Sequence, residues 1–170
     1  LNTGPLGVTG SDSANTIASK ADVVLAVGTR LQDFTTGSWT VFAPDARLIG
    51  LNAGRHDAAK HRSVTVVGDA RLGLQTLGDA LGDYRAPAEW TETAQKERNL
   101  WDDYVVADVA VGNRPNSYAQ AIGVVNALCH PRDRVVTAAG GLPAEVTANW
   151  RTLDIGTVDV EFGFSCMGYE

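Results

Sequence analysis

The fold class follows from Ala21-Asp-Val-Val-Leu-Ala-Val-Gly28, a short apolar run that is rich in β-branched residues and stops at a glycine. Such a run is typical of a strand buried in a parallel sheet. Two further runs of this kind follow, Arg47-Leu-Ile-Gly-Leu-Asn52 and Val64-Thr-Val-Val67. We therefore predict three parallel strands in the first part of the chain.

Helices are expected between these strands. Ser11 and Asp12 are candidate N-caps for a helix near Ser13–Lys20. A second helix from about Ala70 to Leu81 has an apolar face. That face is formed by Leu72, Leu74, Leu77 and Leu81. Strands separated by helices indicate an α/β fold with a parallel sheet and right-handed crossovers.

The composition changes at Gly82. Residues 82–87 look like a linker, and a charged helix is expected from about Ala88 to Val111, followed by a break at Asn113–Asn116. One side of this helix carries Trp90, Ala94, Glu97 and Trp101. The predicted parts are therefore residues 1–82, a linker and connecting helix at 83–116, and a second unit at 117–170.

Residues 117–170 begin a second α/β pattern. The expected elements are a helix capped by Ser117 and ending at Cys129, a turn at His130–Asp133, a strand at Arg134–Ala138 that runs into Gly140-Gly141, a helix near Pro143–Trp150, and a strand at Thr157–Val160. Two strands are too few for an independent α/β domain, so we expect this unit to be part of a larger one.

Composition excludes several classes of function. The net charge is −6 with no basic patch, which argues against a nucleic-acid partner. The longest apolar run, Val23–Val27, is far shorter than the roughly 20 residues of a membrane span. Cys129 and Cys166 match no metal spacing and favour a reducing, cytoplasmic location. Residues 1–5 have no signal-peptide features.

The loop Gly28–Gly37 follows the first strand, where ligands bind in open α/β sheets. Its polar side chains are suited to a phosphate or ribose. They are Thr29, Arg30, Thr35 and Thr36. A structural loop with Arg30 in an ion pair is the stronger interpretation, because the glycine spacing matches neither a dinucleotide fingerprint nor a P-loop.

The remaining polar residues favour structural roles. The histidines do not cluster in the sequence, so no metal site is expected from them. They are His56, His61 and His130. The aspartates at element boundaries fit turn and cap roles. They are Asp22, Asp69 and Asp133.

The stretch Gly163-Phe-Ser-Cys-Met-Gly168 has glycines at both ends, which allow a close approach of its backbone to a ligand. A planar heterocycle could take hydrogen bonds from this backbone while Met167 supports it from beneath. An ordinary strand-to-helix turn with a core methionine fits the pattern equally well.

Together, these stretches resemble thiamine-diphosphate (ThDP) enzymes of the acetolactate synthase and pyruvate oxidase type. The resemblance is carried, in order, by Gly4-Pro-Leu-Gly7, Ala21–Arg30, Phe42-Ala-Pro-Asp-Ala46 and Gly68-Asp69. It implies that residues 1–82 are a Rossmann-like middle domain and that residues 117–170 open a diphosphate-binding domain.

Within this superfamily, the chain is most similar to the trihydroxycyclohexane-1,2-dione hydrolase family of myo-inositol catabolism. The similar stretches are Gly4–Gly10, Val27–Trp39, Ala138–Pro143 and the most specific one, Glu161–Glu170. The resemblance implies hydrolysis of a carbon–carbon bond, which opens the cyclic dione to a deoxyglucuronic acid. A ThDP-dependent 2-oxo acid carboligase or decarboxylase, and a free-standing nucleotide-binding or scaffold module, are the alternatives.

The resemblance also implies site residues. The residue that matches Met167 lies under the cofactor and enforces its V shape, and its amide donates to a pyrimidine nitrogen. The carbonyl that matches Ser165 accepts a hydrogen bond from the 4′-amino group. Gly140 and Gly141 match the loop that approaches the diphosphate. The V shape brings the 4′-imino nitrogen beside C2, so that the cofactor can deprotonate itself.

Two family elements are expected outside the chain. The catalytic glutamate is expected before Leu1, and the Gly-Asp-Gly…Asn motif for the Mg²⁺ that bridges the diphosphate is expected after Glu170. We therefore expect part of a longer protein that binds no ThDP and has no activity by itself. FAD is not expected, since hydrolysis needs no redox chemistry. The parent is expected to be a homodimer or homotetramer, because its family binds ThDP between two subunits.

Overall fold

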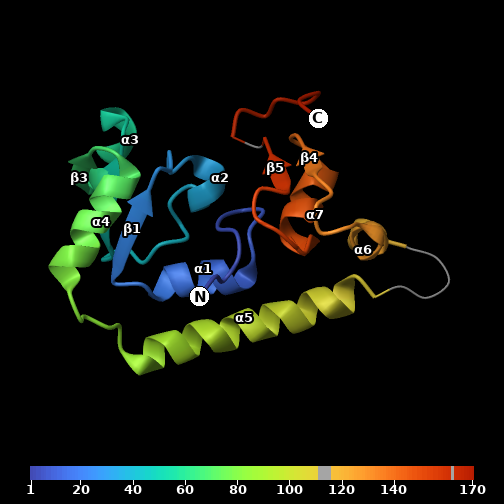
Figure 1. Cartoon of the computed structure of the whole chain (residues 1–170), viewed down its shortest axis with the longest axis horizontal. Helices are drawn as coiled ribbons and strands as arrows, with labels where there is room; N and C mark the ends of the chain where they lie inside the picture. The colour runs from blue at the N-terminus through green and yellow to red at the C-terminus, as the bar shows by residue number, and fades with distance from the viewer. Residues whose placement is uncertain (111–115, 162) are drawn as a thin grey trace.

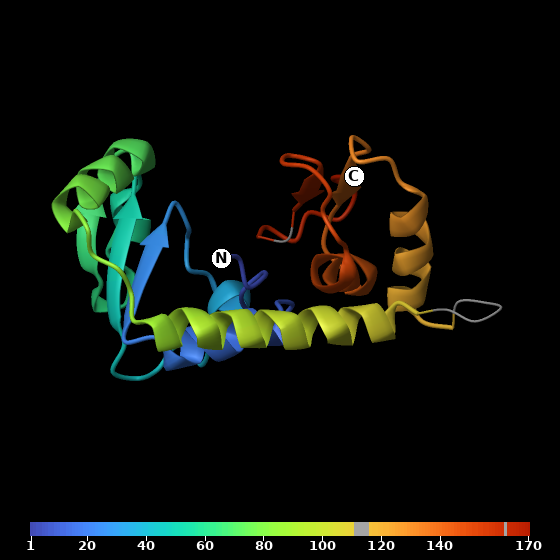
Figure 2. The same ribbon diagram turned by 60° about the horizontal axis from the view of Figure 1, so that its bottom comes forward.

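The computed structural model describes residues 1–110, 116–161 and 163–170. Within them, a three-stranded parallel sheet and a two-stranded parallel sheet lie in two separate units, and a long helix, α5 (Ala88–Asp108), runs beneath both (Figures 1 and 2). The predicted α/β class with parallel sheets is confirmed. In the part of the chain that the structure describes, no helix combines the length and apolar character needed to cross a membrane.

The first sheet contains the three predicted strands. They are β1 (Val23–Val27), β2 (Arg47–Asn52) and β3 (Val64–Val67), with β2 in the middle. Every pairing is parallel; Leu25 lies opposite Ile49, and Ile49 lies opposite Val64. The carboxyl ends of all three strands therefore meet at one edge.

The prediction that the first strand is buried is wrong for much of its length. Ala26 is buried, but Val23 and Leu25 are exposed. Among the described strands β1 pairs only with β2, so one of its edges has no partner there. Ala26 of β1 forms a buried cluster with Leu31 and Phe42. Leu6 and other partly buried side chains pack against this cluster.

The predicted helices of this unit are present with the predicted caps. The hydroxyl of Ser11 accepts a hydrogen bond from the amide of Ala14 at the start of α1 (Asp12–Lys20). The carboxylate of Asp69 accepts one from the amide of Leu72, 2.9 Å away, at the start of α4 (Ala70–Leu81). Each cap satisfies an N–H that the helix itself leaves unpaired.

The predicted apolar face of α4 is exposed, since Leu72, Leu74, Leu77 and Leu81 all retain more than a third of their accessible surface. The helix approaches β2 through Gly73 instead, where an added Cβ would lie 2.7 Å from a methyl carbon of Leu51. Three short helices complete the unit. They are α2 (Asp33–Thr36), α3 (Arg55–Ala58) and the 3₁₀ helix η1 (Lys60–Arg62).

Helix α5 buries Ala94, Trp101 and Val105, on the side that the sequence predicted. It packs against α1, and Lys20 forms an ion pair with Glu97 at 3.3 Å. The helix was expected to reach Val111, but it ends at Asp108. Most of the predicted break at Asn113–Asn116 lies outside the described residues, which leave out 111–115.

The second unit has the predicted order of elements. They are α6 (Tyr118–Leu128), β4 (Val135–Thr137), α7 (Gly141–Asn149) and β5 (Val158–Val160). Ser117 caps α6 by accepting from the amide of Gln120, and the amide of Asp133 donates to the carbonyl of His130 at the predicted turn. Helix α7 begins two residues earlier than expected, within the glycine pair.

Candidate functional site

The two glycine-rich stretches of the second unit leave one edge of its sheet. Strands β4 and β5 pair in parallel, with Thr137 opposite Val160, and the amide of Glu161 donates to the carbonyl of Thr137 at 2.9 Å. Residues 138–141 and 163–168 therefore both follow the carboxyl ends of neighbouring strands. This edge is where parallel α/β sheets bind ligands.

Gly140 and Gly141 form the start of α7. Gly140 has φ 149°, a backbone conformation that residues other than glycine rarely adopt. No side chain caps the helix. An added Cβ at Gly141 would meet no atom within 4 Å, so the backbone here is open to a ligand. A helix N-terminus with bare backbone is suited to an anion such as a phosphate.

The turn at residues 163–168 is organised by a carboxylate. One oxygen of Glu161 accepts the amide of Phe164 at 2.8 Å, and the other accepts the amide of Cys166 at 3.0 Å. These hydrogen bonds, that from Cys166 first, lower the pKa of Glu161. Sequence reasoning assigned no role to Glu161. The available signal was an acidic residue directly before a glycine-rich turn whose amides need acceptors.

Ser165 and Met167 lie within this turn. The amide of Met167 donates to the carbonyl of Ser165 at 3.1 Å, and Ser165 has φ 52°. The two backbone groups expected to contact a pyrimidine therefore pair with each other. Met167 is 78% exposed, so the alternative of a core methionine is wrong.

Arg30 connects the loop after β1 to this turn. Its Nη2 donates to the carbonyl of Gly163 at 3.0 Å, and its guanidinium carbon lies 4.1 Å from the centroid of the Phe164 ring. These contacts go to a carbonyl and a ring, whereas the sequence favoured an ion pair. Thr29 and Thr36 form hydrogen bonds within their own loop. Thr29 accepts from the amide of Leu31, and Thr36 donates to the carbonyl of Gln32.

The histidines do not come together. His61 stacks on Trp39, and the Nδ1 atom of His130 accepts the amide of Arg132 in a distant turn. Within residues 1–110, 116–161 and 163–170, no group of histidine, cysteine and acidic side chains is arranged to hold a metal.

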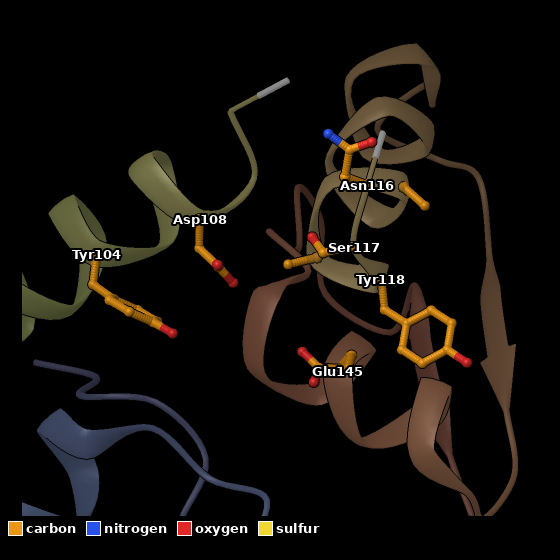
Figure 3. Close-up of a pocket in the computed structure, with 8 residues that line it drawn as sticks. Tyr104, Asp108, Asn116, Ser117, Tyr118 and Glu145 are labelled. Atoms are coloured by element: carbon orange, nitrogen blue, oxygen red, sulfur yellow. The ribbon is translucent and has the colours of Figure 1, made fainter. Parts of the chain in front are cut away.

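A hollow of about 640 Å³ lies elsewhere, between the end of α5 and the second unit. Figure 3 shows Tyr104 and Asp108 of α5 on one side and Tyr118 and Glu145 on the other. None of the predicted site residues lines it. The glycine-rich edge has the open backbone that the predicted ligand needs, so we place the candidate site there and not in this hollow.

Comparison with known proteins relates the first unit of the chain to one protein family. Residues 1–77 match the central domain of thiamine pyrophosphate enzymes. This match covers the first unit, which is similar to that central domain. Thiamine pyrophosphate is another name for ThDP, so the family implies ThDP as the cofactor of the complete enzyme.

Three relatives of the chain carry the same enzyme name. Over the full chain it is 34% identical to the 3D-(3,5/4)-trihydroxycyclohexane-1,2-dione hydrolase of Geobacillus thermodenitrificans and 30% identical to that of Clostridium botulinum. Over 99% of the chain it is 34% identical to hydrolase 1 of Bacillus cereus. The chain spans 30% of the length of each of these relatives.

Proposed function

We propose that this chain is part of a ThDP-dependent hydrolase that cleaves a carbon–carbon bond of trihydroxycyclohexane-1,2-dione in inositol catabolism. The observation that carries the proposal is the similarity to such hydrolases over the whole chain, including the turn at residues 163–168. The reaction therefore needs the ThDP that the family implies. The bound cofactor supplies a nucleophilic carbon for attack on a carbonyl.

The residues at the glycine-rich edge fit ThDP in two places. The open backbone at Gly140 and Gly141, at the start of α7, is suited to the diphosphate. The exposed thioether of Met167 is available as an apolar support for the heterocycle. For the pyrimidine contacts, the Met167 amide must release the Ser165 carbonyl, so that one group donates and the other accepts.

We further propose the domain division at residues 1–82, 83–116 and 117–170. The first part is the central domain, and the last opens the diphosphate-binding domain. A complete enzyme would add an activating glutamate and a Mg²⁺ site from elsewhere in a longer protein. Its subunits would pair as a homodimer or homotetramer in the cytoplasm, without FAD. Without those parts, the 170-residue chain would bind no ThDP and have no activity by itself.

The test uses the product of the complete open reading frame that contains this chain. With ThDP and Mg²⁺ it should consume the cyclic dione and release the ring-opened acid, and EDTA should abolish turnover. Turnover of pyruvate without turnover of the dione would assign a 2-oxo acid enzyme instead. A native gene product whose mass equals that of this chain, 18.0 kDa, would favour a free-standing module.

The inactivity of the isolated chain has its own test. Calorimetric titration of the 170-residue chain with ThDP and Mg²⁺ should show no binding. Micromolar affinity would contradict the proposal that the missing parts are needed to anchor the diphosphate.

A further inference from the structure

We propose that Arg30 is a positioning residue for the cofactor turn, by which we mean residues 163–168. Arg30 would act through Gly163 and Phe164, and so fix the direction in which Ser165 and Met167 face the pyrimidine. This inference rests on the proposed function, since it assigns a purpose to the turn that only a ThDP enzyme would need.

The first observation is the pair of contacts that Arg30 makes. Its hydrogen bond to the Gly163 carbonyl and its position over the Phe164 ring join residues that are 133 positions apart in sequence. A planar guanidinium can donate in its plane and stack on a ring with its face at the same time, whereas a lysine ammonium cannot. Both contacts fall directly before Ser165.

The second observation is the way in which Arg30 is held. Leu31 is buried at 5% exposure and has φ 45°, which is unusual and costly for a residue with a branched side chain. At the peptide that joins Arg30 to Leu31, the ammonium of Lys60 donates to the carbonyl of Arg30 and pairs with Asp57 at 2.9 Å. A strained residue and a paired lysine thus fix the backbone that directly follows the Arg30 side chain.

The third observation is that Glu161 and Arg30 bind different backbone groups of the cofactor turn. Glu161 binds the amides of Phe164 and Cys166 from within the second unit. Arg30 instead donates to a carbonyl of the turn, that of Gly163, and Arg30 comes from the unit that matches the family's central domain. Glu161 can shape the turn, but only a contact from another unit can orient it relative to the central domain.

An anion-binding role for Arg30 is the competing explanation. Its guanidinium is already committed to the Gly163 carbonyl and the Phe164 ring, which favours positioning. The two explanations differ in the response of the chain to inorganic phosphate. We expect no movement of the Gly163–Gly168 amide resonances on its addition, and a saturable movement that Arg30→Gln abolishes would overturn the proposal.

The structural arm of the test uses amide hydrogen exchange of the 170-residue chain by NMR. Arg30→Gln should speed exchange at Phe164 and Cys166 about tenfold, since a charge-assisted hydrogen bond and a cation–π contact are lost. Arg30→Lys should recover part of the protection. Arg71→Gln, an exposed arginine of α4, is the matched control and should leave both amides unchanged.

The functional arm uses the complete gene product. Arg30→Gln should raise the ThDP concentration for half-saturation about tenfold while leaving the KM for the dione within about twofold. The ThDP concentration for half-saturation of Arg30→Lys should lie between those of the wild type and Arg30→Gln, and that of Arg71→Gln should match the wild type. An active wild type whose ThDP half-saturation does not respond to Arg30→Gln would overturn the positioning role alone. A wild type without ThDP-dependent turnover would instead overturn the proposed function.

Discussion

At the scale of single residues, the cofactor turn depends on one ionised carboxylate. Both oxygens of Glu161 accept backbone amides, and these hydrogen bonds lower its pKa. A group with a lowered folded-state pKa stabilises the fold fully above its unfolded-state pKa, and this contribution is lost as the pH falls through the folded-state pKa. Acid should therefore loosen the turn as the pH falls through the lowered pKa of Glu161.

Acid titration of the amide proton shifts tests this prediction. The amides of Phe164 and Cys166 should move together, with a midpoint below the roughly 4.3 of an ordinary glutamate. Glu161→Gln should remove this titration, because its amide carries no charge. Glu170→Gln is the matched control: Glu170 accepts the amide of Gly168, and the Phe164 amide donates to Glu161, so the transition at Phe164 should remain. A transition that survives in Glu161→Gln would assign it to another group.

Sequence reasoning found the position of this turn but not what holds it. The glycines around Met167 are a local signal, and the resemblance to ThDP enzymes added roles for Ser165 and Met167. The contact from Arg30 joins two units across 133 positions, and no local pattern carries such information. The hydrogen bond between Ser165 and Met167 was likewise not predictable, since it depends on the conformation of the turn.

At the scale of elements, α4 lies against β2 because one glycine lets it approach. An added Cβ at Gly73 would lie 2.7 and 2.8 Å from the two methyl carbons of the buried Leu51. At Gly78, five residues further along the same helix, an added Cβ would meet nothing within 4 Å. Alanine substitution at Gly78 therefore tests helix propensity alone, and the same substitution at Gly73 tests helix propensity together with packing against Leu51.

We expect Gly73→Ala to lower the free energy of unfolding by about 1–2 kcal/mol, because overpacking outweighs the gain in helix propensity. Gly78→Ala should raise it by up to about 1 kcal/mol, since only the propensity gain remains. Urea denaturation of both variants and the wild type is the measurement. A Gly73→Ala variant as stable as Gly78→Ala would mean that the helix shifts away from β2 at no cost.

The elements that the sequence predicted well are those with local signals. The bounds of β2, β3 and α4 agree with the prediction, because turn residues flank the strands and Asp69 caps the helix. The burial predicted for β1 was wrong for much of the strand, and the apolar leucine face of α4 is exposed, since burial depends on which layers lie above a surface. The early start of α7 reflects Gly140, whose φ of 149° lets the chain turn into the helix.

At the scale of the whole molecule, α5 joins the two units through one aspartate. The two oxygens of Asp102 lie 2.7 Å from Nε of Arg98, on the same helix, and 2.9 Å from Nη2 of Arg151, which follows α7. Arg98 also donates to the carbonyl of Asn2 in the first unit. The N-terminal segment, α5 and the second unit therefore share a single network of charges.

Removing the central charge should loosen this connection. Asp102→Asn leaves Arg98 and Arg151 close together without their shared partner, and we expect a loss of about 1 kcal/mol, the upper end for partly exposed pairs. Asp103→Asn, at the exposed neighbouring position, should change the free energy of unfolding by less than about 0.5 kcal/mol. Urea denaturation at low salt measures both.

Salt dependence then distinguishes a charge network from simple loss of packing. In 1 M NaCl the screening length falls to about 3 Å, so the difference between Asp102→Asn and the wild type should shrink. Amide exchange should locate the effect: protection in α7 should fall more than protection in β2, because the network holds the second unit to α5 while β2 has its own sheet. An equal loss of protection in both, unchanged by salt, would mean that Asp102 supports the fold as a whole and does not join its units.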